Sequence, residues 1–265
     1  MNHTASLLES NQVLVSLEET NDALDRSTPM PLVGACGIVE EVGNGFTGTF
    51  EKGQAVMMII PAKQTPESNV TLEGTVLCIK PPELALKQAA TISASYILAH
   101  AATQAYEHAL RSGTSVTNSG FSAPGVSILV TRGETSTSAI LCLLLKAAHP
   151  DAQIFVMVDL KEHDDLVKRA GQYVLSFRAH YAIDANATET LQHLKAGLEG
   201  YTGRKMFDGL IDVTSFAQKV PDILSILEDE HVFVDATAVP TGDPKEIMDS
   251  LRSFIDSNAS CLIEL

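Results

Sequence analysis

The sequence contains no tryptophan, and aromatic residues make up only 5% of it. Cysteine is also rare, and the four cysteines (36, 78, 142 and 261) form no CxxC pair and no Cys/His cluster with the spacing of zinc ligands. We therefore expect no metal site. Cys36, Cys78 and Cys142 lie in apolar surroundings and should pack as small hydrophobic residues. Tryptophan fluorescence cannot report ligand binding in this chain.

Positive charge is scarce, because 18 Lys and Arg residues face 33 Asp and Glu residues, which gives a formal net charge of −15. Such a charge disfavours binding to nucleic acids and to anionic membranes. The first residues lack the basic region and apolar core of a secretory signal. No apolar run reaches the roughly 18 residues that span a bilayer. We therefore expect a cytoplasmic protein that binds neither nucleic acid nor membrane.

Hydrophobic residues make up 45% of the 265 positions and charged residues 19%, which is typical of a globular protein with one large domain or two smaller ones. The first 80 residues favour β-structure. Short apolar runs separated by glycine turns predict strands over residues 13–17, 38–42, 55–60 and 75–79. Strands of this length with glycine corners indicate a small barrel or a curled sheet.

The pattern changes near residue 84. The alanine-rich segment 84–110 predicts two helices, and the tail 244–265 predicts a helix with room for a final strand. Between them, strands are expected over 128–130, 154–158, 173–176, 209–212 and 232–235, and helices over 136–148, 161–170, 189–198 and 220–228. Alternating units of this kind imply a parallel, doubly wound sheet with helices on both faces.

Three segments together resemble the medium-chain dehydrogenase/reductase family. The segment "PLVGACGIVEEVGNGFTGTFEKGQAVMMIIP" (31–61) is similar to that family's glycine-rich barrel segment, with Gln54 in place of the usual aspartate. The segment "KPPELALKQAATISASYILAHAATQAY" is similar to its helical bridge. The segment "AQIFVMVDLKEHDDLVKRAGQYVLSFRAHYAID" is most similar to the enoyl-reductase domains of polyketide synthases. The resemblance covers most of residues 13–234.

The resemblance implies an α/β fold, in which a doubly wound parallel (Rossmann-type) sheet is joined to a truncated GroES-like β-barrel domain. On this basis residues 1–90 form the truncated GroES-like β-rich domain. Residues 91–240 form the Rossmann-like domain. Residues 241–265 form a C-terminal helix, after which enough residues are left for one strand.

The segment "ILVTRGETSTSAILCLLLKAAHPDAQIFVMVD" (128–159) has the strand, turn, helix and strand of a dinucleotide site, but its turn holds one glycine. The family's "GGVG" aligns with residues 135–138. Each replaced glycine is expected to cost about 1 kcal/mol or more where a positive φ is needed. Glu134 would also repel phosphates. We therefore expect a degenerate site with no cofactor, and NADPH only if the chain is an active reductase. The candidate nucleotide-binding residues are Thr131, Arg132, Ser136 and Arg178.

Candidate catalytic residues lie on the bridge and near the N-terminus. Tyr96 and His100 are four residues apart on an expected helix and so share a face, where they can act as general acid and base. A partly buried helix histidine is the alternative for His100. Asn21 and Asp25 are candidate polar residues of the substrate site, or else members of a turn-forming loop. The tyrosine proton donor of many polyketide enoyl reductases has no counterpart here.

Three functions fit these observations. The first is an enoyl-reductase-like protein of secondary metabolism that has lost NAD(P)H redox activity. It would act on a polyketide-type or other hydrophobic carbonyl intermediate by cyclisation, isomerisation or dehydration. The second is an NADPH-dependent, trans-acting enoyl reductase. The third is a non-catalytic pseudo-reductase that binds a polyketide synthase. A homodimer through the edge strand 232–235 is also expected from the resemblance.

Overall fold

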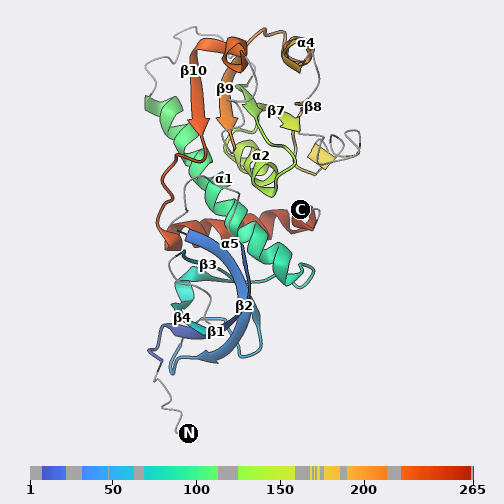
Figure 1. Cartoon of the computed structure of the whole chain (residues 1–265). Coiled ribbons are helices and arrows are strands. Elements are labelled where there is room, and N and C mark those ends of the chain that lie inside the picture. Colours follow the sequence, from blue (N-terminus) through green and yellow to red (C-terminus); the bar gives the residue numbers. More distant parts are fainter. Residues whose placement is uncertain are drawn as a thin grey trace. The chain divides into compact units, whose positions relative to one another are not determined.

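The computed structural model describes residues 8–21, 32–46, 48–62, 69–112, 125–158, 168, 170, 172–173, 176–185, 190–213, 222–263 and 265. The chain divides into two compact units, Met1–Ile97 together with Thr241–Leu265, and Leu98–Pro240 (Figure 1). Helix α1 (Leu86–Ser112) is one continuous helix and contributes residues to both units. The expectation of two helices over 84–110 is therefore wrong, because no proline or glycine interrupts this alanine-rich segment.

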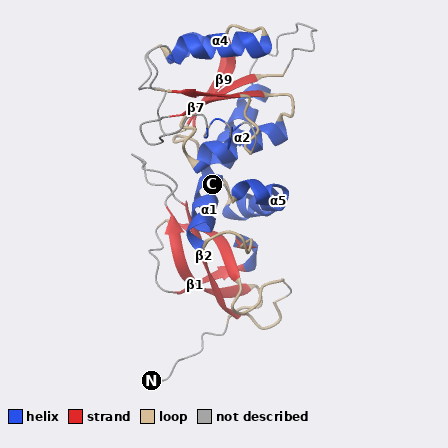
Figure 2. Cartoon of the chain, turned by 90° about the vertical axis from the view of Figure 1, so that its right-hand side faces the viewer, coloured by secondary structure: helices blue, strands red, loops and turns tan. Residues whose placement is uncertain are grey.

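The first unit is built on a five-stranded antiparallel sheet with the strand order β4-β1-β2-β3-β5. Its strands are β1 (Gln12–Asn21), β2 (Leu32–Val42), β3 (Ala55–Pro61), β4 (Asn69–Glu73) and β5 (Leu77–Ile79), and the 3-10 turn η1 (Gly74–Val76) precedes β5. Two register shifts between β1 and β2 mark bulges, which bend strands. The sheet curves accordingly (Figure 2), as predicted for a curled sheet, although β4 was not anticipated.

Alternating side chains divide this sheet into two faces. One face forms a core of small and branched residues, including Val13, Val39 and Val56. The other face packs closely on α1, because a Cβ at Gly34 of β2 would lie 2.2 Å from the backbone nitrogen of Ala94. Glycine at position 34 therefore allows the close approach of helix and sheet.

The C-terminal helix α5 (Pro244–Leu262) belongs to the first unit. Asp243 caps it by accepting hydrogen bonds from the backbone nitrogens of Lys245 (2.8 Å) and Glu246 (3.4 Å), and Pro244 occupies a first-turn position where its missing N–H costs nothing. The predicted start of this helix at residue 244 is confirmed. The final strand is not formed in the part of the tail that the structure describes, where Ile263 lies in a turn.

The second unit contains a five-stranded parallel sheet with the order β10-β9-β6-β7-β8. Its strands are β6 (Ser127–Val130), β7 (Gln153–Val158), β8 (Tyr181–Asp184), β9 (Phe207–Asp212) and β10 (Leu227–Asp235). Helices α2 (Ser136–Ala148) and α4 (Thr190–Thr202) lie on opposite faces of the sheet (Figure 2). The predicted α/β class, a Rossmann-type sheet with a truncated GroES-like β-rich part, is confirmed.

Two predicted elements of this unit are wrong. The described residues of 173–176 form no strand, since Tyr173 is helical and Ser176 lies in a turn, and the next strand along the chain is β8. An α-helix was expected over 220–228. The described residues 222–228 instead form the short 3-10 helix η4 (Ile223–Ile226) and the start of β10. Pairing of Leu227 with Phe207 of β9 overrides the local helical pattern there. Most of the helix expected over 161–170 lies outside the described residues.

Candidate functional site

The β6–α2 turn (131–135) lies where β6 ends, at the carboxyl edge of the parallel sheet. Folds of this class bind their ligands at that edge. Buried Thr131 links the ends of two strands, because its Oγ1 donates to Asp212 Oδ1 (2.7 Å) and accepts from the backbone nitrogen of Val213 (2.8 Å). The turn is thus anchored to the end of β9. Asp212 was missed in the sequence, where an acid at the end of an apolar strand was the available signal.

Further hydrogen bonds lock the backbone of the turn. The nitrogen of Gly133 donates to the carbonyl of Met157 at 2.6 Å, and the hydroxyl of Tyr173 donates to the carbonyl of Gly133. Thr135 caps α2, with its Oγ1 accepting from the backbone nitrogen of Ser138 (3.2 Å). The Ser138 hydroxyl in turn donates to the carbonyl of Thr131 at 2.7 Å. Side chains therefore hold this turn in place.

The missing glycines do not strain the turn. Thr135 has an extended backbone with φ of −93°, and Ser136 to Ser138 lie in the first turn of α2. Among the described residues of the turn, only Arg132 has a positive φ, of 55°. The one glycine sits where it is needed, because a Cβ at Gly133 would lie 2.3 Å from Val156 Cγ1. The strain expected at residues 135, 136 and 138 is therefore wrong.

The carboxylate of Glu134 does not stand alone at this turn. It forms an ion pair with Nε of Arg132, and only 2% of its side-chain surface is exposed, against 20% for Arg132. The contact is an ion pair rather than a well-aligned hydrogen bond. Because the two opposite charges lie side by side, the repulsion of phosphates that was expected from Glu134 is largely cancelled.

The first turn of α2 can accept an anion. The backbone N–H groups of Ser136 and Thr137 precede the intrahelical hydrogen-bond ladder, and the helix dipole places partial positive charge there. The Thr137 hydroxyl is buried and has no hydrogen-bond partner among the residues that the structure describes. Phosphate groups bind at helix ends of this kind. The residues present therefore fit the phosphates of a dinucleotide.

Arg178 lies in the second unit but is not part of the β6–α2 turn. Its charge lowers the pKa of Lys146, which is lowered mainly by burial and sits in the last turn of α2. Among the described residues, Arg178 makes no hydrogen bond or ion pair with Thr131, Arg132 or Ser136. Its neighbour Ala179 donates a hydrogen bond to the carbonyl of Tyr173, whose hydroxyl bonds to Gly133 of the turn. Arg178 also has a positive φ, of 60°.

The predicted catalytic residues of the first unit hold helices in place. The Tyr96 hydroxyl lies 2.7 Å from Ser250 Oγ, and its ring centroid lies 5.1 Å from that of Phe254 on α5. Burial raises the pKa of Tyr96 to about 12, although the bond to Ser250 opposes the rise. Asn21 Nδ2 donates to Thr91 Oγ1 at 2.7 Å and so connects β1 with α1.

The remaining two candidates are His100 and Asp25. His100 is half-buried on α1, four residues after Tyr96, as the sequence predicted. Asp25 lies outside the described residues. The roles of Tyr96, His100, Asn21 and Asp25 in catalysis remain predictions.

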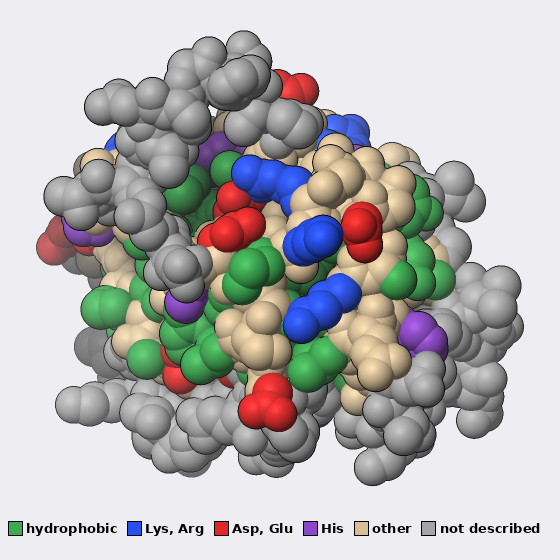
Figure 3. Space-filling model, turned by 90° about the horizontal axis from the view of Figure 1, so that it is seen from above, with side chains coloured by type: hydrophobic (Ala, Val, Ile, Leu, Met, Phe, Trp, Pro, Cys, Tyr) green, Lys and Arg blue, Asp and Glu red, His purple; other side chains and the backbone are tan. Residues whose placement is uncertain are grey.

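The described ranges contain neither a cluster of metal ligands nor a membrane-spanning helix. No three His, Cys, Asp or Glu side chains gather there as metal ligands. None of the helices in those ranges is long and apolar enough to cross a membrane. On the face seen in Figure 3, basic and acidic side chains lie next to one another rather than forming a surface of one sign.

Solved structures share this fold. No protein-family model matches the sequence, and no curated protein is similar enough to it in sequence to count as a match. The CurK enoyl reductase is 11% identical, with a TM-score of 0.56 over 99% of this chain and 79% of that one. Quinone oxidoreductase of Escherichia coli, complexed with NADPH, is 18% identical, with a TM-score of 0.50 over 100% and 82%. TarJ of S. aureus, in complex with NADPH, is 11% identical, with a TM-score of 0.54 over 96% and 80%.

The chain therefore has the fold of the medium-chain dehydrogenases/reductases, and it is enoyl-reductase-like in architecture. The expectation that no cofactor is used is wrong, because proteins of this fold were solved with NADPH bound. The physical arguments behind that expectation also fail, since the residues that replace the glycines, 135, 136 and 138, need no positive φ and Glu134 is paired with Arg132.

Proposed function

We propose that this chain is an NADPH-dependent reductase of a hydrophobic α,β-unsaturated carbonyl compound. The observation that carries the proposal is the β6–α2 turn at the carboxyl edge of the parallel sheet, where residues 135, 136 and 138 need no positive φ and the carboxylate of Glu134 is paired with Arg132. The likeness in fold to oxidoreductases solved with NADPH supports the cofactor. The likeness to an enoyl reductase, in sequence segments and in fold, supports the substrate class.

Three groups of the turn would hold the cofactor's phosphates. The N–H groups of Ser136 and Thr137 would donate to phosphate oxygens, as the first turn of a helix does in this fold class. The guanidinium of Arg132 would add a cation with the forked geometry that suits phosphate. Glu134 would act as a positioning residue, because its buried carboxylate fixes the Nε edge of Arg132. NADPH, when bound, supplies a hydride.

On the substrate side, His100 remains the predicted proton donor. Tyr96 is poorly suited to that role, since burial raises the pKa of its phenol and its hydroxyl is engaged with Ser250. Substrate contacts by Asn21 and Asp25 stay predictions, as does a polyketide synthase as partner. Non-redox chemistry was expected because the cofactor site was thought to be blocked, and the turn removes that reason.

The test is NADPH oxidation by the purified chain with an α,β-unsaturated acyl thioester, followed by the loss of NADPH absorbance. The proposal expects oxidation that requires the thioester and yields the saturated product by mass spectrometry. Arg132→Ala should raise the KM for NADPH. Arg111→Ala is the matched control, since Arg111 is an exposed arginine of the same unit that pairs with Glu107 on α1. NADPH binding without reduction of any enone would overturn the reductase and favour cyclisation, isomerisation or dehydration.

A further inference from the structure

Two pockets lie next to each other on the first unit. Each has a volume of about 560 Å³, within the usual range for small-molecule sites, and both are lined by Thr49, Phe50 and Arg252. These shared residues make the two pockets neighbours, one on the side of Phe46 and the other on the side of Ile79 and α5, and we treat them together as one groove. We call it the Phe50 groove. All its lining residues belong to the first unit.

The Phe50 groove has an aromatic floor of defined shape. The ring centroids of Phe46 and Phe50 lie 5.9 Å apart at an angle of 39°. Two glycines make room for the Phe46 ring, because a Cβ would lie 2.1 Å from it at Gly48 and 2.5 Å from it at Gly74. At the other end, Ile79 leaves 42% of its surface exposed, which is high for a large apolar residue. The groove thus offers apolar surface that the described chain does not cover.

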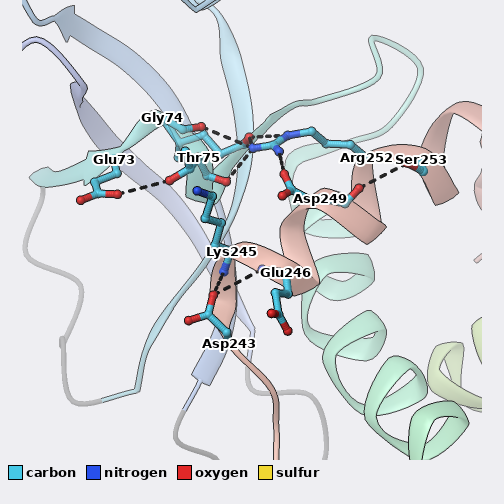
Figure 4. A network of polar contacts seen from close by, with 10 residues as sticks. Glu73, Gly74, Thr75, Asp243, Lys245, Glu246, Asp249, Arg252 and Ser253 are labelled. Carbon is cyan, nitrogen blue, oxygen red and sulfur yellow. Dashed lines mark hydrogen bonds and ion pairs between the residues drawn. The ribbon is translucent and has the colours of Figure 1, made fainter.

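The arginine of the groove is already engaged by the protein (Figure 4). Its Nε donates to the carbonyl of Leu77 (3.1 Å), and its Nη2 donates to the carbonyls of Thr75 (2.7 Å) and Leu77 (2.6 Å). Its Nη1 pairs with Asp249. With most of its in-plane donors occupied, Arg252 would meet a ligand in the groove mainly through the flat face of its guanidinium. Arginine faces stack on aromatic rings.

The second cation that lines the groove, Lys80, also donates its hydrogen bonds to backbone carbonyls. Lys80 Nζ donates to the carbonyls of Pro81 (2.7 Å) and Leu84 (2.5 Å). The carboxylates of Glu73 and Asp256, in contrast, are exposed. An anionic ligand would therefore meet occupied donors and two carboxylates. Charge thus disfavours anions, and the aromatic floor and the guanidinium face favour a planar ring.

We propose that the Phe50 groove binds a small, uncharged, planar aromatic molecule that stacks on Phe50 and on the guanidinium face of Arg252. This site is separate from the nucleotide turn, and the proposal does not depend on NADPH. Its occupant is a small molecule of the naphthol or indole class.

The test uses ligand-observed NMR on the full chain with three probes of similar size: 2-naphthol, its saturated analogue decahydro-2-naphthol, and 2-naphthoate. Naphthol is expected to bind at least about fivefold more tightly than the saturated alcohol, as ring stacking on an aromatic side chain and a cation would give. Naphthoate is expected to bind more weakly than naphthol. Equal binding of the aromatic and saturated alcohols, tighter binding of naphthoate, or no binding of naphthol at millimolar concentration would each overturn the proposal.

Two variants locate the binding. Phe50→Leu keeps an apolar side chain and should weaken naphthol binding about threefold to tenfold. Thr49→Trp places a large side chain at the point shared by both pockets and should abolish it. Leu224→Trp, at an exposed position of the second unit, is the matched control and should bind naphthol as the original chain does. Thermal unfolding of each variant confirms that it is folded, and unchanged binding by Thr49→Trp would place naphthol outside the groove.

Discussion

The hydroxyl of Tyr96 lies 2.7 Å from Ser250 Oγ, across a sequence separation of 154 residues. This bond connects α1 with α5 inside the first unit, and the contact of Tyr96 with Phe254 reinforces it. A residue singled out as a candidate acid or base is thus held in a buried contact between two helices.

Tyr96→Phe and Ser250→Ala should each lower the free energy of unfolding by about 1 kcal/mol, the usual contribution of such a hydrogen bond. The double variant should cost little more than either single one, because both remove the same bond. Urea denaturation measures all three. Additive losses would show that the two hydroxyls do not interact. Unchanged turnover in Ser250→Ala would separate this structural bond from catalysis.

Gly209 on β9 lies against the fully buried ring of Tyr106. A Cβ there would come within 2.6 Å of Cε2 and 3.0 Å of the hydroxyl oxygen. Gly209→Ala should therefore destabilise the chain by about 1–3 kcal/mol, the usual cost of overpacking a core. Gly200→Ala is the matched control on α4, where a Cβ meets no atom within 4 Å. It should stabilise the helix by about 0.5–1 kcal/mol, so equal effects of the two changes would refute the packing argument.

His180 should make stability depend on pH. Its Nδ1 accepts a hydrogen bond from the backbone nitrogen of Ile154 (3.2 Å), and burial, followed by the charge of Lys146, lowers its pKa from the ordinary value of 6.5. The unfolded chain therefore takes up a proton before the folded chain does. The stabilisation is complete above about pH 6.5 and is lost as the pH falls through the lowered pKa.

Urea denaturation at a series of pH values checks this expectation. The original chain should lose stability more steeply below pH 6.5 than His180→Asn, which cannot take up the proton. Parallel curves for the two proteins would assign the acid sensitivity to other groups.

Removing Arg132 should lower the free energy of unfolding by more than removing the charge of Glu134. Arg132→Ala leaves a buried carboxylate without its cation and should cost about 3 kcal/mol of stability. Glu134→Gln leaves a more exposed arginine that water can solvate, and should cost about 1 kcal/mol or less. Chemical denaturation of both variants measures the difference. A larger loss in Glu134→Gln would mean that the buried member of the pair has been misidentified.

Much of the fold follows from the sequence. Helix α2 was predicted at its observed bounds from the apolar stretch that follows the turn, but its cap is Thr135 rather than the Ser136 or Thr137 that the sequence suggested. The start of β10 was missed, since its first residue is held as a strand by pairing with Phe207 of β9, a contact between distant residues. The undivided α1 was also missed, although no breaker interrupts it.

The candidate site was only partly predictable. Thr131, Arg132 and Ser136 were found from the position of the turn after β6. The strain argument failed because the alignment could not show that the replaced glycines would lie at negative φ, with the positive φ moved to Arg132. The charge argument failed because an ion pair between residues two apart depends on side-chain directions that a turn sets. The contact of Thr131 with Asp212 joins two strands and has no local signal.

The most direct test of the proposed function is titration calorimetry of the purified chain with NADPH, since no tryptophan is present to report binding. We expect a dissociation constant in the micromolar range or tighter, about −8 kcal/mol. Arg132→Ala should weaken it about tenfold or more, as the loss of a charged hydrogen bond would, whereas Arg111→Ala should leave it unchanged. No heat of binding at millimolar NADPH would contradict the assignment of the β6–α2 turn as a nucleotide site.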